Sequence, residues 1–226
     1  MKKYNLLLLD ADDTVFDFAL AEEAAFQLAC DAMGLTVTRE QFVVYADINK
    51  KLWSAFVRKE VTQEELRVLR FSRFLDAFGI PLDAEKMAGF FVEALSCQTQ
   101  EIDGALDLVR EAASRAPVVI VTNGIAKVQR TRFSLSPIGL YIAGLVISGE
   151  VGFAKPDPRM IERAMEISGI PDAAPLMVGD EPASDIAAAN AAGVGSCWFN
   201  PGGRVNETPH RPTYEIRTLS EVMQWL

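Results

Sequence analysis

The sequence predicts an α/β fold, with a doubly wound, mostly parallel sheet as the core and a block of helices inserted into it. After Gly104, short apolar runs alternate with helical stretches, which is the pattern of βαβ units. A further apolar run near the N-terminus has no strand-like neighbour, so it must pair with strands from the second half. We therefore expect a discontinuous core of residues 1–15 and 101–226, with a helical domain of residues 16–100.

The first strand is predicted over residues 4–9, because this apolar run ends in acidic residues, as a buried strand does at a sheet edge. Four more strands are predicted from later apolar runs. These runs are Val118 to Val121, Leu145 to Ile147, Leu176 to Val178 and Gly195 to Phe199.

The inserted block has no strand-like run, and its apolar residues recur at helical spacing. Thr38 with Gln41, and Thr62 with Glu65, have the spacing of capping boxes. Gly34 is placed to end a helix, as are Gly79 and Pro81. This punctuation predicts four helices, at about residues 17–33, 39–58, 63–78 and 84–97.

Composition excludes several classes of protein. The formal net charge of −9 argues against binding a nucleic acid polymer, which needs clustered Lys and Arg. No apolar stretch approaches the length of about 18 residues that a membrane span needs, and the N-terminal apolar run stops at Asp10. Three scattered cysteines favour neither a disulfide framework nor a zinc site. We expect a soluble cytoplasmic protein; the sequence indicates no particular oligomeric state.

Polar residues suited to phosphate chemistry follow four of the predicted runs. In an open parallel sheet, ligands bind at the carboxyl ends of the strands, so these residues should share one crevice. They are Asp10, Asp12 and Asp13; Thr122 and Asn123; Lys155; and Asp180 with Asp185.

Several carboxylates in one small site repel one another unless a cation is present, and oxygen ligands suit Mg²⁺. The residues then match the needs of phosphoryl transfer from a small phosphorylated metabolite. Asp10, at the rigid end of a strand, is a competent nucleophile. Asp12, two residues on, could act as general acid and then as general base.

In order, strand context and spacing, these four groups resemble the motifs of the haloacid dehalogenase-like hydrolase superfamily, whose core is Rossmann-like. The helical insertion resembles that superfamily's C1 cap domain. The resemblance implies a Mg²⁺-dependent phosphatase in which Asp10 is nucleophile and metal ligand and Asp12 is acid/base and ligates through its carbonyl. Asp180 would be the other metal ligand.

The resemblance also implies roles for the remaining motif residues. Thr122 and the amide of Asn123 would hold the phosphoryl group, and Lys155 would neutralise charge beside the nucleophile. Asp185 would orient Lys155 or a metal-bound water. Dehalogenase members lack a carboxylate at the position of Asp12, which favours a phosphatase over a dehalogenase.

A narrower resemblance is to the branch that contains YjjG-type pyrimidine 5'-nucleotidases, which implies nucleoside monophosphates as substrates. Asp13 departs from the commonest superfamily pattern, where many members carry Gly, but an acidic residue at this position is also a tendency of that branch. The segments that resemble the branch run from Val146 to Pro156, from Leu176 to Asp180 and from Cys197 to Asn200.

In the helical domain, Trp53 could stack on a base, and an arginine could contact polar groups of the substrate. Packing in the core is the alternative for Trp53, and solvation is the alternative for the arginines. The candidates in this domain are Asn49, Trp53, Arg70 and Arg73.

Other functions stay open at this point. The phosphatase could act on another small metabolite, such as phosphoglycolate or a sugar phosphate, or the chain could be a phosphomutase. A signalling receiver domain also groups carboxylates, Thr and Lys, but its phosphorylated Asp follows the third strand rather than the first. A binding or scaffold protein could retain the fold without catalysis.

Overall fold

The computed structural model describes residues 3–226. The chain divides into two compact units, one formed by Met1–Phe18 with Thr99–Leu226 and the other by Ala19–Gln98. The first unit holds the sheet, and the second contains only helices and their connections. None of the helices in the described residues combines the length and the apolar character of a membrane span.

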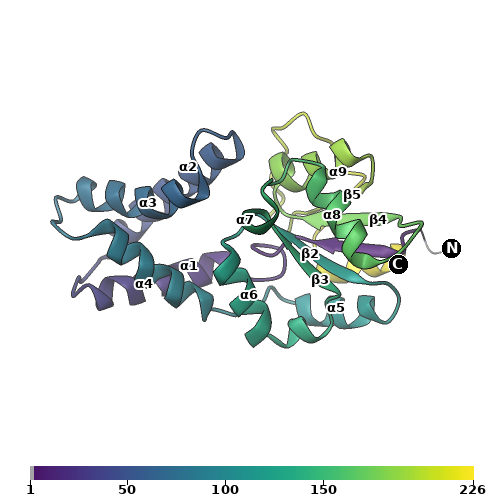
Figure 1. Ribbon diagram of the computed structural model, residues 1–226, viewed down its shortest axis with the longest axis horizontal. Coiled ribbons are helices and arrows are strands. Elements are labelled where there is room, and N and C mark those ends of the chain that lie inside the picture. The colour runs from purple at the N-terminus through teal and green to yellow at the C-terminus, as the bar shows by residue number, and fades with distance from the viewer. Residues whose placement is uncertain (1–2) are drawn as a thin grey trace. The chain divides into compact units, whose positions relative to one another are not determined.

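The core sheet is parallel throughout, with β1 at its centre, and Figure 1 shows it between layers of helices. The strand order is β3-β2-β1-β4-β5-β6. In register, Leu8 of β1 lies opposite Val119 on one side and Met177 on the other. The strands are β1 (Leu6–Leu9), β2 (Val118–Thr122), β3 (Gly144–Ile147), β4 (Pro175–Gly179), β5 (Gly195–Phe199) and β6 (Tyr214–Ile216).

Successive side chains of β1 point to opposite faces of the sheet and pack against two different layers of helices. Leu7 and Leu9 point into a cluster with α5, η1 and η3, whereas Leu6 and Leu8 point into a cluster with α8 and α9. All four leucines are fully buried. The core helices are α5 (Ala105–Ala113), α6 (Ala126–Leu135), η1 (Pro137–Leu140), α7 (Ser148–Val151), α8 (Arg159–Ser168), η2 (Pro182–Ile186), α9 (Ala187–Ala192) and η3 (Leu219–Trp225).

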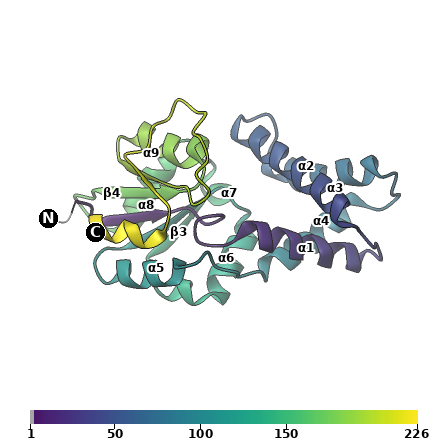
Figure 2. The same ribbon diagram turned by 180° about the vertical axis from the view of Figure 1, so that it is seen from behind.

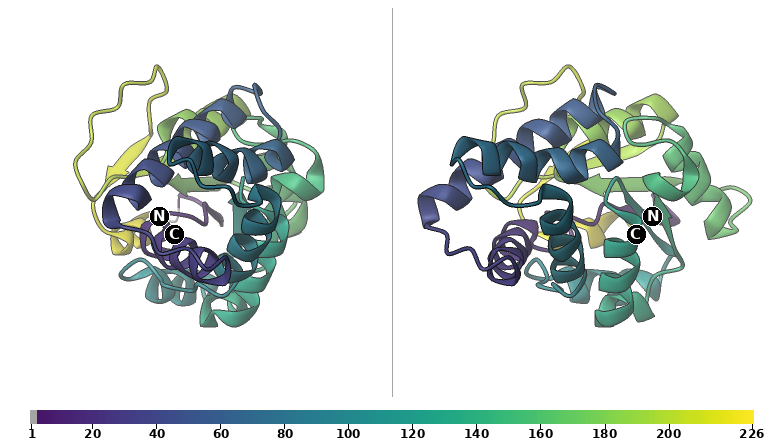
Figure 3. Two further views of the ribbon diagram at one scale, coloured as in Figure 1. Left: turned by 90° about the vertical axis from the view of Figure 1, so that its left-hand side faces the viewer. Right: turned by 60° about the vertical axis from the view of Figure 1, so that its left-hand side comes forward.

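The second unit consists of α1 (Phe18–Ala32), α2 (Arg39–Val57), α3 (Gln63–Ala77) and α4 (Ala84–Ser96), drawn from purple to blue in Figure 3. Both predicted capping boxes are present, at the starts of α2 and α3. Gly34 follows α1 with φ +69°, as a helix stop requires. Stacked and edge-on rings fill the interior; the buried ones are Phe26, Tyr45, Phe71, Phe74 and Phe91.

The predicted strands and helices agree with the structure to within one or two residues at most ends, and the predicted fold class is confirmed. Two C-terminal elements were not predicted, the edge strand β6 and the helix η3, which lie in the segment drawn in yellow in Figure 2. The segments that lead into and out of the helical unit pair with each other, since the Asp17 N–H donates to the Gln100 carbonyl at 2.9 Å and the Ile102 N–H donates to that of Val15 at 2.9 Å.

Candidate active site

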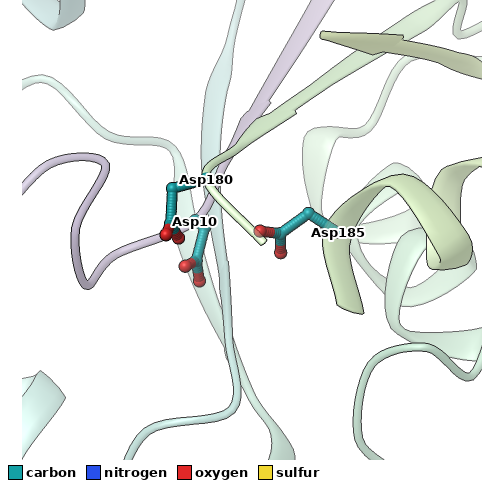
Figure 4. A group of neighbouring side chains, drawn as sticks. All are labelled: Asp10, Asp180 and Asp185. Atoms are coloured by element: carbon teal, nitrogen blue, oxygen red, sulfur yellow. The ribbon is translucent and has the colours of Figure 1, made fainter. Parts of the chain in front are cut away.

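Three carboxylates gather at the carboxyl ends of the central strands. Asp10 directly follows β1, Asp180 directly follows β4, and Asp185 lies in η2. One carboxylate oxygen from each side chain lies within 4.8 Å of the others, and Figure 4 shows the three groups converging from separate segments. Adjacent parallel strands thus bring Asp10 close to Asp180 and Asp185, which are 170 positions or more further along the chain.

Lys155 connects two of these carboxylates. Its side chain is only 2 % exposed, and its Nζ donates to Asp10 Oδ1 at 2.5 Å and to Asp185 Oδ1 at 2.6 Å. Burial alone would lower the pKa of Lys155, but the two carboxylates outweigh it, so the net shift is upward. The lysine is therefore a fixed positive charge beside Asp10.

Asp185 is held in place from both sides. While Oδ1 accepts from Lys155, Oδ2 accepts from the Glu181 N–H at 3.0 Å. A Cβ on Gly179 would lie 2.2 Å from the Asp185 carboxyl carbon, so only glycine lets this side chain pack against the end of β4. With both oxygens engaged, Asp185 is suited to orienting Lys155.

The other two carboxylates fit a metal ion. Removal from solvent, opposed by Lys155 and assisted by the charge of Asp185, raises the pKa of Asp10 to about 7. Burial and the neighbouring carboxylates also raise the pKa of Asp180 well above its usual value. This crowding of negative charge would be relieved by a hard cation, and oxygen donors of this kind suit Mg²⁺. Asp10 and Asp180 are thus the side chains suited to hold it.

Arg204 was not identified from the sequence. Its guanidinium donates to the backbone carbonyl of Asp180 and lies 3.3 Å from the carboxylate Oδ2 of the same residue. It stands in the loop between β5 and β6, 24 residues after its partner, and about half of its side chain is exposed. Nothing in the local sequence separates it from other loop arginines.

Thr122 and Asn123 lie at the end of β2, and Asn123 is hydrogen-bonded to the backbone of Lys155. Thr122 is buried, and its Oγ1 accepts from the Gly124 N–H at 3.0 Å. The Asn123 side chain donates to the Lys155 carbonyl at 2.9 Å and accepts from the Lys155 N–H at 2.8 Å. The family resemblance implies a role for the backbone amide of Asn123; the structure adds that its side chain fixes the backbone that carries Lys155.

Asp12 contacts two residues of α6 that were not identified from the sequence. Its Oδ1 accepts from Arg132 at 2.5 Å, and its Oδ2 accepts from Gln129 at 2.7 Å. These partners lie 117 and 120 residues further along the chain. The signal that could have found them is their spacing, since positions i and i+3 share one helix face, and this face of α6 is otherwise apolar.

Asp13 has a backbone role. Its φ of +58° lies in the left-handed region, which Gly adopts freely and which Asp and Asn tolerate better than other residues. Its Oδ1 accepts from the Phe18 N–H at 3.2 Å, at the start of α1. The departure from the commoner Gly therefore keeps the turn and adds a bond to the following helix.

The candidates in the helical unit differ in their surroundings. Asn49 and Arg70 are buried and bonded to each other at 3.4 Å, and Asn49 also donates to Glu22 at 2.6 Å. Trp53 is half-buried and meets Phe56 edge-on, whereas Arg73 is exposed. The structure thus brings two of the four together, and a substrate contact by any of them stays a prediction.

Residues 4–193 match the model of the haloacid dehalogenase-like hydrolase family. The chain belongs to this family. Its sequence is 33% identical to the HAD-hydrolase YfnB of Bacillus subtilis, over 98% of this chain and 95% of YfnB. It is 32% identical to the pyrimidine 5'-nucleotidase PynA of Streptococcus pneumoniae, over 99% and 95%, and 31% identical to the pyrimidine 5'-nucleotidase YjjG of Escherichia coli, over 99% and 98%.

The crystal structure of YfnB bound to magnesium matches this chain with a TM-score of 0.91, covering 99% of this chain and 98% of that one. That structure is described as revealing interdomain movement in YfnB. The predicted resemblance to the haloacid dehalogenase-like family is thereby confirmed, and its YjjG-type branch is among the relatives. The protein is a hydrolase of this family.

Proposed function

We propose that this hydrolase is a Mg²⁺-dependent phosphomonoesterase that acts through a phosphorylated Asp10, and that its substrates are nucleoside 5'-monophosphates, with pyrimidines preferred. The observation that carries the mechanism is Lys155, which is buried between Asp10 and Asp185 and donates to both. A nucleophilic carboxylate needs a fixed cation beside it where an anionic phosphoryl group must approach.

In the first half-reaction, a carboxylate oxygen of Asp10 attacks phosphorus and the bond to the ester oxygen breaks. Asp12 gives its proton to the departing oxygen, so that the alcohol leaves as a neutral molecule. Thr122, at the end of β2, and the amide of Asn123 would hold the phosphoryl oxygens, while Lys155 offsets their charge.

In the second half-reaction, Asp12 removes a proton from water, and the water oxygen attacks the phosphorus of phospho-Asp10. The phosphorus bond to Asp10 then breaks, which releases inorganic phosphate and restores the carboxylate. Asp10, Asp180 and the Asp12 carbonyl would hold Mg²⁺, which when bound supplies further positive charge to the phosphoryl oxygens.

The substrate class is supported by the relatives. PynA and YjjG are both pyrimidine 5'-nucleotidases, and each is aligned over 99% of this chain, including its whole helical unit. A full-length alignment covers the core motifs as well as the inserted helices. We therefore extend this substrate class, including the pyrimidine preference, to the present protein.

The direct test is phosphate release by the purified protein in the presence of Mg²⁺ and of EDTA. The panel holds pyrimidine and purine 5'-monophosphates, the corresponding 3'-monophosphates, phosphoglycolate and sugar phosphates. We expect metal-dependent release with the highest kcat/KM for pyrimidine 5'-monophosphates. Preference for another ester would overturn the substrate class alone, whereas the absence of metal-dependent release from every ester would overturn the phosphatase.

Asp12→Asn is expected to lower kcat/KM for nucleoside monophosphates by roughly 10²- to 10⁴-fold, because the alkoxide then departs without a proton. An aryl phosphate, whose leaving group is stable as an anion, should lose much less. Steady-state kinetics on the two ester types measures the difference. Equal losses on both would contradict the acid role of Asp12.

Mg²⁺ is expected to raise Tm by about 3–5 °C at a concentration about ten times its Kd. Without metal, the raised pKa values of Asp10 and Asp180 mean that the folded protein binds more protons than the unfolded chain, so its stability falls as pH rises from about 4 to about 7. Metal binding needs ionised carboxylates, so the gain in Tm should grow over the same interval.

Thermal unfolding at about pH 5 and about pH 7.5, with MgCl₂ or EDTA, measures this gain. Asp180→Asn serves as the control and should lose it. An equal gain at both pH values, or an unchanged gain in the variant, would contradict the assignment of these two ligands.

A further inference from the structure

Both oxygens of the Asp12 carboxylate have their own donor on α6. Arg132 Nη1 lies 2.5 Å from Oδ1, and Gln129 Nε2 lies 2.7 Å from Oδ2. The two donors are 0 % and 1 % exposed, whereas the Asp12 side chain keeps 26 % of its surface accessible. The two donors on α6 thus fix the Asp12 carboxylate, while part of its side chain stays accessible to solvent or substrate.

Arg132 is itself held rigidly. Its guanidinium carbon lies over the Phe16 ring, 4.2 Å from the ring centre, where a cation is attracted to the aromatic face. A buried ion pair is seldom more stabilising than an apolar residue of the same volume, so stability gives no reason to fill this space with arginine. The reason for an arginine here is that the ion pair fixes the orientation of the Asp12 carboxylate.

Gln129 reaches the carboxylate across the turn that follows β2. A Cβ on Gly124 would lie 2.3 Å from Gln129 Nε2 and 2.9 Å from Gln129 Cγ, so the side chain passes where only glycine leaves room. The amide Oε1 of Gln129 is buried and has no hydrogen-bond partner among residues 3–226. A side chain placed only for packing would not leave an acceptor unsatisfied, whereas one oriented by its bond to Asp12 does.

We propose that Gln129 and Arg132 are positioning residues for the acid/base Asp12. They hold the two carboxylate oxygens in one orientation, so that the same group faces the leaving oxygen in the first half-reaction and the water in the second. The inference rests on the proposed function, in which Asp12 is the acid/base. A displacement of about 1 Å in a reacting group can cost about 10²-fold in rate, which sets the expected size of the effect.

The test compares Gln129→Met and Arg132→Met with Asp12→Asn, and with the two double variants that combine each methionine with the asparagine. The matched control is Arg130→Met, because Arg130 lies on the same helix but is exposed and pairs with Glu150 at the surface. Each variant is assayed on a nucleoside monophosphate and on an aryl phosphate, and its folding is checked by thermal unfolding.

We expect Gln129→Met and Arg132→Met to lower kcat/KM for the nucleotide by about 10- to 100-fold, with a smaller loss on the aryl ester. Each should add little to the loss caused by Asp12→Asn, since both act through that carboxylate. Arg132→Lys keeps the charge and one donor, so it should recover part of the nucleotide activity. Arg130→Met should match wild type.

Losses that are equal on the two esters, or that multiply with the loss from Asp12→Asn, would overturn the positioning role. So would unchanged kinetics. If Arg132→Met does not fold, Gln129→Met decides the question alone. If Asp12→Asn loses activity equally on the two esters, the acid/base assignment in the proposed function fails. If Asp12→Asn loses more on the nucleotide but the methionine variants lose equally on both esters, only the positioning role fails.

Discussion

Replacement of Asp10 by asparagine is expected to reduce phosphate release by at least about 10⁴-fold, because the amide offers no anionic oxygen to attack phosphorus. The fold should survive the change. Asparagine has nearly the same shape, its Oδ1 can still accept from Lys155, and Lys155 keeps its bond to Asp185. We expect Tm to stay close to that of the wild type.

The matched control is Asp13→Asn, the same chemical change three residues along. Asp13 is exposed, and asparagine keeps both the acceptor for the Phe18 N–H and the tolerance of a positive φ. This control should retain nearly the wild-type rate. Wild-type turnover by Asp10→Asn, measured by phosphate release under saturating substrate, would rule out Asp10 as the nucleophile.

Lys155→Met is expected to lower both stability and activity. The change leaves the carboxylates of Asp10 and Asp185 buried side by side without their shared cation, and breaking a buried pair in this way costs about 3–5 kcal/mol. In a protein of this size, that corresponds to a fall in Tm of roughly 6–20 °C. The phosphoryl group would also meet uncompensated negative charge, so kcat/KM should fall by about 10²-fold or more.

The loss of stability in Lys155→Met should depend on pH. Burial raises the pKa of Asp10, and Lys155 lowers it against this effect and that of the Asp185 charge. Without the lysine, the folded-state pKa of Asp10 should rise further above its unfolded value, so this part of the stability is present at low pH and is lost as pH rises. Thermal unfolding at about pH 5 should therefore show a smaller deficit than at about pH 7.5. Adding Asp185→Asn should restore part of the stability, because it removes one of the two uncompensated charges.

Lys127→Met on α6 is the control for removing a lysine, since Lys127 is exposed and should change Tm very little. A Tm of Lys155→Met within the range of this control would contradict the structural role of the bridging lysine. Near wild-type kinetics in the same variant would contradict its catalytic role.

Local signals explain why most of the fold could be predicted. The capping boxes at Thr38 and Thr62, and the glycine stop at Gly34, depend on residues only a few positions apart. The buried strands are continuous apolar runs. Strand β6 has only three residues, one of them buried, and it exists because Tyr214 lies opposite Cys197 on β5. A short edge strand of this kind carries no periodic pattern of its own.

The same distinction applies to the candidate site. Residues that directly follow a strand could be placed together, because parallel strands deliver their ends to one edge of the sheet. Residues that reach the site from the middle of a helix or from a long loop could not. Gln129 and Arg132 act from α6, and Arg204 acts from the loop before β6. The spacing of Gln129 and Arg132 places them on one face of α6, but which residue that face contacts depends on tertiary packing.

The central claim is that a phosphoryl group is carried on Asp10 between the two half-reactions. The most direct measurement uses Asp12→Asn with Mg²⁺ and an aryl phosphate, quenched with acid during turnover and analysed by peptide mass spectrometry. Because this variant lacks the base for the second half-reaction, we expect phospho-Asp10 to accumulate after a burst of aryl alcohol, and to be missing when Asp10 is also replaced by asparagine. A burst without a covalent phosphoryl group, or with the group on another residue, would contradict the account.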